Sequence, residues 1–460
     1  MEGKVKLSVL IGSMMVLLAL SALAGLNYRQ ILTITIFSTV ISSIILFWSI
    51  RIPIAMLGVF LLLSIGLIDV PSLIKFANID VVLFLVATMI IVGFLEERHF
   101  FGYLMNLIVA KFGSDARRLI RILMLISGIF SALVGTISSA LFMTVSILSI
   151  ARYYKLNPVP YVVMSVFASN IGSSATVMGN PVGVLIALKS GLTFNEFIRW
   201  ATPISLLSLI LCIEVCLRVF KKEVEQLDKS IKLKAEDKEV GGGLEITSRE
   251  LMESGIVFFG TIIGLALYSP LENLLGLKKN SLLLGVVLSM AGLALLIERG
   301  RVREIIEHRV EWADMVFFIM LFASVGALEY VGITEVVAEA LSHVPGGEIT
   351  ILITLIVMTG VLSAFLDNVL AVATIAPIVE AFGNVGFKEN LLWWGVLFAG
   401  TYFGNLTLIG STANIVAMGI LEKRGIKTIS FKDWIKYGSL ITLLTITLAI
   451  VLLILQAPLM

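Results

Sequence analysis

The chain has 460 residues, of which 58% are hydrophobic and 14% charged, and its formal net charge is +2. A soluble domain carries roughly 25% charged residues, so this composition excludes an ordinary soluble protein. No basic patch with interleaved aromatic residues is present, so no nucleic-acid partner is expected. Apolar windows of about 20 residues, enough for a membrane-spanning helix, recur along the chain. We therefore predict an all-α polytopic protein of the cell (plasma) membrane.

The predicted elements begin with a membrane helix near the N-terminus. Residues 1–25 have a basic start and a long apolar run without a clear cleavage site, and many spans follow, so a first membrane helix is favoured over a signal peptide. Cys212 and Cys216 lie four residues apart in an apolar segment, which indicates helix packing rather than a disulfide or metal site. The uninterrupted crossings are predicted at residues 7–25, 31–50, 53–70, 80–97, 201–219, 252–269, 281–298, 312–330 and 438–457.

Four further apolar segments carry polar interruptions. Segments 159–190 and 390–421 contain Gly-rich polar stretches and are predicted as broken helices that cross the membrane. Segments 119–150 and 349–380 read apolar–polar–apolar and are predicted as re-entrant hairpins. The fold is therefore expected to have about eleven transmembrane helices plus two hairpins.

A polar stretch divides the chain into two halves. Residues 221–250, "KKEVEQLDKSIKLKAEDKEVGGGLEITSRE", mix both charge signs and are predicted as a solvated cytoplasmic linker. The predicted parts are an N-terminal helix at 1–30, a first repeat at 31–220, this linker, and a second repeat at 251–460.

The distribution of Lys and Arg predicts the orientation of these spans. With the hairpins returning to their own side, the basic clusters at 98–121 and 299–309 fall on one side together with the linker. The other side receives only Arg29, Lys75, Lys189, Arg199, Lys278, Lys279 and Lys388. By the positive-inside rule, the N-terminus is predicted to be cytoplasmic.

Weak internal similarity in a constant order indicates a repeat. "VGFLEE" from Val92 pairs with "VGALEY" from Val325, and "SALVGTISSALFMTVSIL" from Ser131 with "SAFLDNVLAVATIAPIVE" from Ser363. "TVMGNPVGVL" similarly pairs with "TLIGSTANIV", and "TFNEFIRW" with "SFKDWIKY". Basic residues flank the first hairpin, whereas Glu348 and other acids flank the second. The two halves are therefore predicted to have inverted topology, as in secondary transporters with a midplane site.

The hairpin tips and helix breaks supply the candidate site. A carboxylate at the bilayer centre costs roughly 2.5–3.5 kcal/mol on insertion scales, and Asp367 is the only carboxylate in these four polar stretches. It is predicted to be the principal charged group of a coupling-ion site, and no catalytic residue or cofactor is expected. The predicted ion- and substrate-binding residues are Thr136, Ser138, Ser139, Asn170, Ser173, Ser174, Thr176, Asn180, Asp367, Asn368, Asn405, Thr407, Ser411 and Asn414, with a candidate sodium site at Asp367, Asn368 and Asn405.

These stretches resemble a known transporter group. "LNPVPYVVMSVFASNIGSSATVMGNPVGVLIAL", "SAFLDNV" and "GNLTLIGSTANIVAMGILEKRG" are similar to broken-helix and hairpin motifs of the ion transporter superfamily. The similar branch contains arsenite permeases, D-type sodium–proton antiporters and the melanosomal P-protein, and is related to divalent anion–sodium symporters. The resemblance covers about residues 31–457. It implies a homodimer in which scaffold helices hold two mobile transport units that work by an elevator-like movement.

The chain departs from that family pattern in two places. The first hairpin of the family usually has Asp-Asn where this chain has Gly135-Thr136. The first broken helix usually reads Gly-Asp-Pro-Pro-Asn, whereas this chain has Asn180 for the Asp and Gly183 for the Asn.

Three function classes follow from these observations. A secondary active transporter accounts for the repeat and for Asp367, a channel would use similar polar loops, and a membrane-embedded enzyme would need more acids, His or metal ligands at depth. Within the first class, arsenite or anion transport is preferred on the resemblance, and sodium–proton exchange is the alternative. The coupling ion is expected to be sodium or a proton. No Walker loop is present, so ATP could act only through a separate ATPase subunit.

Overall fold

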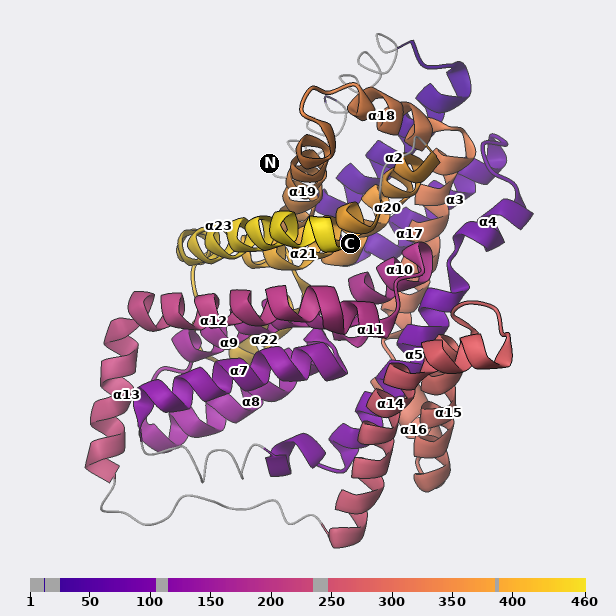
Figure 1. The fold of residues 1–460 in the computed structure, drawn as a ribbon. Coiled ribbons are helices and arrows are strands. Elements are labelled where there is room, and N and C mark those ends of the chain that lie inside the picture. The colour runs from indigo at the N-terminus through magenta and orange to yellow at the C-terminus, as the bar shows by residue number, and fades with distance from the viewer. Residues whose placement is uncertain (1–11, 13–24, 105–114, 235–246, 385–388) are drawn as a thin grey trace.

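The computed structural model describes residue 12 and residues 25–104, 115–234, 247–384 and 389–460, and every regular element in these ranges is a helix (Figure 1). Eight of these helices are long and apolar enough to cross a membrane. The prediction of an all-α polytopic membrane protein is thereby confirmed. The first predicted crossing, 7–25, lies almost entirely outside the described residues.

The first half begins with helices that the sequence caps explicitly. The Asn27 side chain accepts a hydrogen bond from the Gln30 backbone N–H, and the Gln30 side chain accepts one from the Asn27 backbone N–H, forming a capping box at the start of α2. Asp69 caps α4 in a similar way through the Ser72 backbone N–H. The elements are α2 (Tyr28–Leu46), the 3₁₀ turn η1 (Trp48–Ile50), α3 (Arg51–Ser64), α4 (Val70–Phe76) and α5 (Ile79–Glu97).

A helical hairpin and a broken helix follow. Gly135, at φ +92°, separates the two hairpin helices, and a backbone of this kind favours glycine because it has no Cβ. The elements are α7 (Ala116–Val134), α8 (Thr136–Tyr154), α9 (Val159–Gly172), the 3₁₀ turns η2 (Ser173–Ala175) and η3 (Val177–Gly179), α10 (Pro181–Ser190), α11 (Phe194–Glu196), the π turn η4 (Phe197–Ala201), α12 (Thr202–Val219) and α13 (Lys221–Lys234).

The second half has the same order of elements. Its hairpin is formed by α19 and α20, and its broken helix by α21, η5 and α22. The elements are α14 (Ser248–Leu275), α15 (Ser281–Ile297), α16 (Val302–Arg309), α17 (Trp312–Tyr330), α18 (Ile333–Ser342), α19 (Gly347–Phe365), α20 (Asn368–Asn384), α21 (Glu389–Tyr402), η5 (Phe403–Asn405), α22 (Thr412–Lys423), α23 (Phe431–Gln456) and η6 (Ala457–Leu459).

Part of the polar stretch between the halves is helical. We expected residues 221–250 to be a solvated linker, but α13 occupies its first part, and α14 already begins at Ser248. Val224, Leu227 and Ile231 repeat at helical spacing and are buried, and α13 packs against α7 and α8. The linker is therefore shorter than predicted, because these three apolar side chains give α13 a face to bury.

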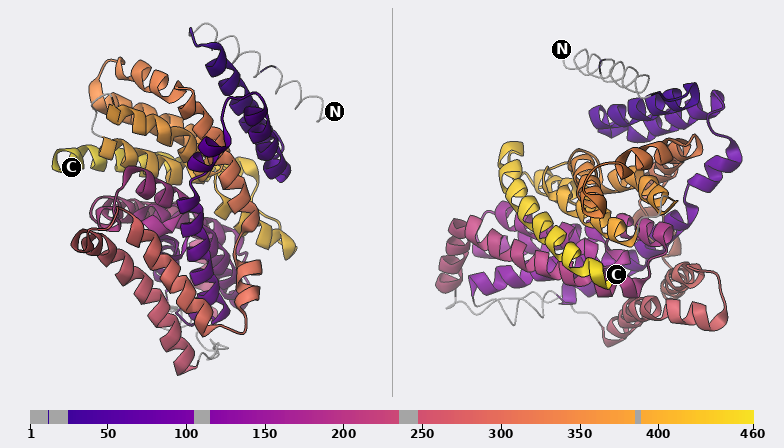
Figure 2. Two further views of the ribbon diagram at one scale, coloured as in Figure 1. Left: turned by 90° about the vertical axis from the view of Figure 1, so that its right-hand side faces the viewer. Right: turned by 45° about the horizontal axis from the view of Figure 1, so that its top comes forward.

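The two halves interlock rather than forming separate domains. In the first broken helix, α10 contacts α20 and α21 of the second half, and in the second broken helix, α22 contacts α8 and α9 of the first. The outer helices exchange partners as well, because α5 packs against α15 and α17 packs against α3 and α4. Figure 2 shows α2 and α3 lying along one side of the second-half helices. The central hairpins and broken helices therefore share one core.

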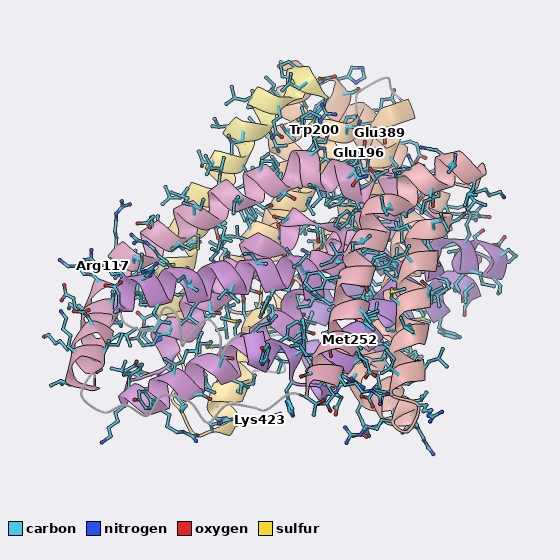
Figure 3. All side chains as sticks on the ribbon, turned by 60° about the horizontal axis from the view of Figure 1, so that its bottom comes forward. Arg117, Glu196, Trp200, Met252, Glu389 and Lys423 are labelled. Atoms are coloured by element: carbon cyan, nitrogen blue, oxygen red, sulfur yellow. The ribbon has the colours of Figure 1, made fainter. Side chains whose placement is uncertain are left out.

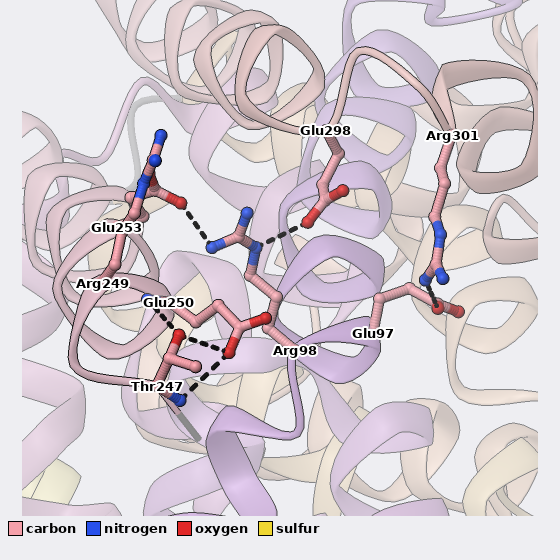
Figure 4. A network of polar contacts seen from close by, with 8 residues as sticks. All are labelled: Glu97, Arg98, Thr247, Arg249, Glu250, Glu253, Glu298 and Arg301. Atoms are coloured by element: carbon pink, nitrogen blue, oxygen red, sulfur yellow. Dashed lines mark hydrogen bonds and ion pairs between the residues drawn. The ribbon is translucent and has the colours of Figure 1, made fainter. Parts of the chain in front are cut away.

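Charged residues gather at the ends of the helices. Arg98, which follows α5, contacts Glu253 of α14 at 2.6 Å and Glu298 after α15 at 2.7 Å (Figure 4). This three-residue cluster ties α14 and α15 to the end of α5. In Figure 3, Glu196 and Glu389 are both seen toward one end of the molecule and Lys423 toward the other.

Candidate functional site

A small cavity lies where the two hairpins meet the two helix breaks. Its volume is about 40 Å³, enough for a few waters or one compact ion. The lining combines polar residues of these elements with side chains of α5 and α17. The lining residues are Met89, Thr136, Ile137, Asn180, Pro181, Val182, Asp314, Phe318, Asp367, Asn368, Val369, Ser411, Thr412 and Ala413.

Four helices begin at this cavity. The first residues of α8, α10, α20 and α22 are Thr136, Pro181, Asn368 and Thr412, and each lines it. Backbone N–H groups at a helix N-terminus lack partners within the helix, and the helix dipole places partial positive charge there. Two of these ends already have a side-chain acceptor, because Asn180 Oδ1 accepts a 2.8 Å hydrogen bond from Gly183 N of α10 and Asp367 Oδ1 accepts one from Val369 N of α20. The other ends give the cavity an electrostatic preference for negative charge.

Asp367 brings a carboxylate into this setting. Its side chain is buried, with 8% of its surface exposed. Oδ1 accepts a 3.0 Å hydrogen bond from Val369 N at the start of α20, and Oδ2 accepts one from the Thr412 hydroxyl at the start of α22. The carboxylate thus spans two helix N-termini. Asp314 of α17 lines the same cavity, and its own cationic partner is Arg51.

Asn368 offers a further oxygen beside Asp367. Its Oδ1 is buried and has no hydrogen-bond donor among the described residues. Leaving a buried acceptor unpaired costs roughly 1–3 kcal/mol, so an unpaired acceptor on a residue that lines a cavity is a candidate partner for an ion or water. Asp367 and Asn368 together therefore provide oxygen ligands of the kind that hard cations use.

A buried amide network joins the two broken helices. Asn170 Nδ2 donates to Asn405 Oδ1 at 2.8 Å and to Asn414 Oδ1 at 2.9 Å. Asn170 Oδ1 accepts from the Ser411 hydroxyl at 3.0 Å. Asn414 in turn donates to two backbone carbonyls of its own half, those of Gly404 and Thr407. All the polar side chains in this network are buried, so it fixes how the two breaks are placed relative to each other.

Each break is also bonded to its own hairpin by a threonine. The Thr176 hydroxyl donates to the Ala132 carbonyl of α7, and the Thr407 hydroxyl donates to the Ala364 carbonyl of α19. Thr176 and Thr407 occupy matching places in the repeat, as do Ala132 and Ala364. In the first half, the backbones of α7 and α9 also approach closely, because a Cβ on Gly172 of α9 would lie 2.3 Å from the carbonyl oxygen of Gly128 in α7.

The structure brings five of the predicted residues to the cavity and places the others nearby. Thr136, Asn180, Asp367, Asn368 and Ser411 line it. Asn170, Asn405 and Asn414 belong to the amide network, so Asn405 uses its side chain there and does not line the cavity with Asp367. The remaining six predicted residues do not line the cavity either. Ser173 accepts a hydrogen bond from Asn180, and Ser174 shares one with Ser205. Ser139 donates to the Ser127 carbonyl, Thr176 and Thr407 donate to the hairpins, and Ser138 is half-buried on α8.

Sequence reasoning missed Asp314 and Thr412. Asp314 lies in the first turn of α17, outside the four polar stretches, and only the packing of α17 against α20 brings it to the cavity. Its position inside a predicted crossing at 312–330 was the available signal, because an acid in an apolar span is a candidate functional residue. Thr412 sits inside the polar stretch that ends at Asn414, directly after Ser411.

Broken helices and hairpins that meet at a cavity containing polar side chains are typical of membrane transporters. The profile of the citrate transporter family, CitMHS, matches residues 41–399. The chain therefore belongs to this family, and the expected relationship to the branch that contains the P-protein is confirmed.

Individual relatives are transporters or membrane proteins. An uncharacterized transporter of Mycobacterium tuberculosis is 32% identical over 374 residues, covering 80% of this chain and 84% of that protein. The human P protein is 24% identical over 450 residues, covering 80% of this chain and 53% of that protein.

Two solved transporter structures share the fold. The YdaH transporter of Alcanivorax borkumensis matches with a TM-score of 0.57 at 14% identity, covering 85% of this chain and 87% of that chain. MtrF of Neisseria gonorrhoeae, whose structure is described as illuminating a class of antimetabolite efflux pumps, matches with a TM-score of 0.58 at 12% identity, covering 86% and 84%.

Proposed function

We propose that the protein is a secondary active transporter that moves a small anion and couples its movement to a sodium ion or proton at Asp367. The observation that carries the proposal is the cavity at which four helix N-termini meet two carboxylates. Helix N-termini favour an anion, and a carboxylate in a membrane protein favours a cation or proton. One cavity with both features suits the joint binding of oppositely charged species.

The absence of basic side chains at the cavity supports coupling. No Lys or Arg is among the cavity-lining residues in the described part of the chain. An anion bound there would depend on backbone N–H groups and a co-bound cation. The unpaired Asn368 Oδ1 beside Asp367 is a further oxygen for such a cation. The cation would then contribute to anion affinity, which is the physical basis of coupling.

The substrate is proposed as a small inorganic or organic anion. The resemblance of the motifs favours arsenite, whereas the family whose profile matches the chain is named for citrate transport. A cavity of about 40 Å³ is too small for a drug-sized ligand, since such sites span roughly 300–1,000 Å³. A tricarboxylate would therefore need the hairpins to move apart, whereas a compact inorganic ion would not. This difference makes arsenite and citrate a useful first pair of test substrates.

Sodium–proton exchange is the second candidate. Asp314 and Asp367 line one cavity, and a carboxylate that binds sodium and a proton in turn is the minimal requirement for exchange. The small size of this cavity disfavours a channel, because an open channel needs a continuous pore.

The working mechanism is proposed to be an elevator-like movement in a homodimer. The moving unit would comprise α7 to α10 and α19 to α22, and the scaffold would include α3, α5, α15 and α17. The N-terminus is proposed to be cytoplasmic, with the tip at Gly135 reached from the inside and the tip at Asp367 from the outside. Impermeant thiol reagents would test the topology with Arg117→Cys and Glu348→Cys, which are exposed near the starts of α7 and α19, after replacement of the buried Cys212 and Cys216. Labelling of both positions from one side only would contradict the inverted topology.

The decisive experiment is a transport assay in proteoliposomes. Uptake of labelled arsenite and of labelled citrate would be measured under imposed sodium gradients, proton gradients, or neither. We expect saturable uptake of one anion, with accumulation only when a cation gradient is present. Cation exchange without either anion would favour the antiporter. Non-saturating flux that ignores both gradients would favour a channel and end the proposal.

A further inference from the structure

The described residues place an ion pair at the wall of the cavity, and only one of its members, Asp314, lines the cavity itself. Arg51 starts α3, Asp314 lies in the first turn of α17, and Arg51 Nη2 contacts Asp314 Oδ1 at 2.5 Å. Their side chains are 22% and 16% exposed. The pair is therefore mostly shielded from water, which makes its electrostatic influence larger than that of a surface ion pair.

Aromatic rings hold the Arg51 side chain in place. Its guanidinium carbon lies 4.6 Å from the centre of the Trp48 ring and 5.6 Å from that of Phe317. These two rings contact each other edge-on at 6.4 Å. A guanidinium held between aromatic faces is positioned in a way that a lysine cannot reproduce. Arg51 is thus a fixed positive charge on the outer helices.

Asp314 connects this fixed charge to the cavity. Asp314 lines the cavity together with Asp367, whereas Arg51 lies behind Asp314 and is not part of the lining. Because Asp314 shares the cavity with Asp367 and contacts Arg51, both charges contribute to the electrostatic potential at Asp367. The packing explains how, because α17 contacts α3 on one side and α20, which begins next to Asp367, on the other.

The two charges act on Asp367 in opposite directions. The negative charge of Asp314 favours a cation or proton at Asp367, because it adds to the negative potential there. The positive charge of Arg51 opposes that binding. The remaining groups nearby are the hydroxyl of Thr412 and, on the α17 side, Glu311, which is exposed and precedes that helix. The cation affinity of the cavity is therefore set by a balance between Asp314 and Arg51.

We infer that the Arg51–Asp314 pair sets the cation affinity of the Asp367 site and makes that affinity depend on the docking of the α19–α20 hairpin against α17. This inference rests on the proposed function, in which Asp367 binds the coupling cation. The pair stays with α3 and α17, whereas Asp367 belongs to the hairpin. Asp314 therefore strengthens cation binding only while the hairpin is docked, and by linkage a bound cation stabilises the docked arrangement. An empty, charged Asp367 facing Asp314 is repelled, which discourages docking without the cation.

The test compares substitutions of opposite sign. Asp314→Asn removes the negative charge, so the half-saturating sodium concentration should rise by roughly fivefold to tenfold. If the proton is the ligand, the pH midpoint of its binding should fall instead. Arg51→Gln removes the positive charge and should move both quantities the other way by a similar factor. The double variant should return toward the wild-type value, because two additive effects of opposite sign and similar size cancel.

Purified full-length protein provides the measurement without a known substrate. Equilibrium binding of radioactive sodium would be measured at constant ionic strength with choline chloride, and the thermal unfolding midpoint would be followed against sodium concentration and against pH. Asp80→Asn and Arg29→Gln are matched controls, since Asp80 lies in the first turn of α5 and Arg29 at the start of α2, and both are exposed. These controls should leave both responses unchanged.

The outcomes separate this inference from the proposed function. If Asp367→Asn keeps the wild-type sodium and pH responses, the proposed cation site is wrong. If Asp367→Asn abolishes the responses but Asp314→Asn and Arg51→Gln shift them in the same direction or not at all, only the inference about the pair is wrong. Should Arg51→Gln fail to fold, Arg51→Met removes the charge, keeps an apolar side chain beside the two rings and should raise the cation affinity in the same way. Unchanged or lower affinity in Arg51→Met would also overturn the inference.

Discussion

The two hairpins occupy matching places in the two halves, yet their tips differ in chemistry. The α7–α8 tip has Gly135 and Thr136, whereas the α19–α20 tip has Asp367 and Asn368. Both tips start a helix whose first residue lines the cavity, and both hairpins accept a hydrogen bond from a threonine of the neighbouring break. The geometry is thus shared, while the charge is present on one side alone.

This difference indicates a division of roles between the hairpins. Thr136 uses its hydroxyl to bond the Gly179 carbonyl at 3.0 Å, so the first tip is satisfied within its own half. The second tip leaves Asn368 Oδ1 unpaired and holds the Asp367 carboxylate against α22. The first hairpin therefore frames the cavity, and the second supplies the groups that would bind a cation. The following predictions test that contrast.

The largest effect is expected for Asp367→Asn. The substitution keeps the shape and removes the only carboxylate of the hairpin tips, so gradient-driven accumulation should fall roughly tenfold or more. Thr136→Val at the other tip should leave the dependence on the cation gradient unchanged, even if the rate falls. Accumulation in proteoliposomes measures both. Equal loss of coupling in the two variants would remove the proposed division of roles.

A large loss of stability is expected for Asn170→Ala. Asn170 is buried and bonds Asn405, Asn414 and Ser411 of the other half, so its removal leaves three polar partners unsatisfied. The cost should be about 3 kcal/mol of unfolding free energy. Denaturant titration in detergent would measure it, with the exposed Asn195→Ala as a control that loses a single hydrogen bond to Ala266. A cost below that of the control would mean that the network does not hold the breaks together.

Smaller and nearly equal effects are expected for Thr176→Val and Thr407→Val. Each removes one hydroxyl that donates to a hairpin carbonyl, at matching places of the repeat. Each should cost about 1 kcal/mol, because the residue volume is nearly kept and one buried carbonyl loses its donor. Thermal unfolding would compare the two variants directly. A marked asymmetry would show that the shared bond carries different weight in the two halves.

The smallest effect is expected for Gly135→Ala. Gly135 has φ +92°, which disfavours residues with a Cβ, while a Cβ built there meets nothing closer than the Met178 carbonyl at 4.0 Å. The cost is therefore conformational rather than steric and should be about 1 kcal/mol or slightly less. Thermal unfolding of this variant, with Gly255→Ala in open space on α14 as a control, would measure it. An unchanged midpoint would mean that the tip can adopt another backbone conformation.

Much of the helix arrangement could be predicted from the sequence because it depends on local signals. The crossing expected at 312–330 coincides with α17, and that expected at 281–298 differs from α15 by one residue. The hairpin at 119–150 corresponds to α7 and α8, with Gly135 at the turn. Apolar length, glycine and proline carry this information, since the bilayer requires every spanning backbone to satisfy its own hydrogen bonds.

The site was only partly predictable because side-chain direction depends on tertiary contacts. Ser173 and Ser174 are adjacent in the sequence, yet the first bonds Asn180 beside the cavity and the second faces Ser205 of α12. Asn405 was expected beside Asp367 but turns toward Asn170 of the other half. The polar residues in these stretches therefore indicated the region of the site. They did not distinguish the side chains that line the cavity from those that form hydrogen bonds between the two helix breaks.

The sequence by itself determined that this is a helical membrane protein, where its helices break, and that Asp367 is the carboxylate of those breaks. Apolar length and the cost of burying charge are local properties, so they can be read without knowing the neighbours. Only the tertiary structure decided that Asp314 and Thr412 meet Asp367, that α13 packs instead of remaining a linker, and that four helix N-termini share one cavity. These features depend on contacts between residues far apart in the chain, which the packing of the two halves creates.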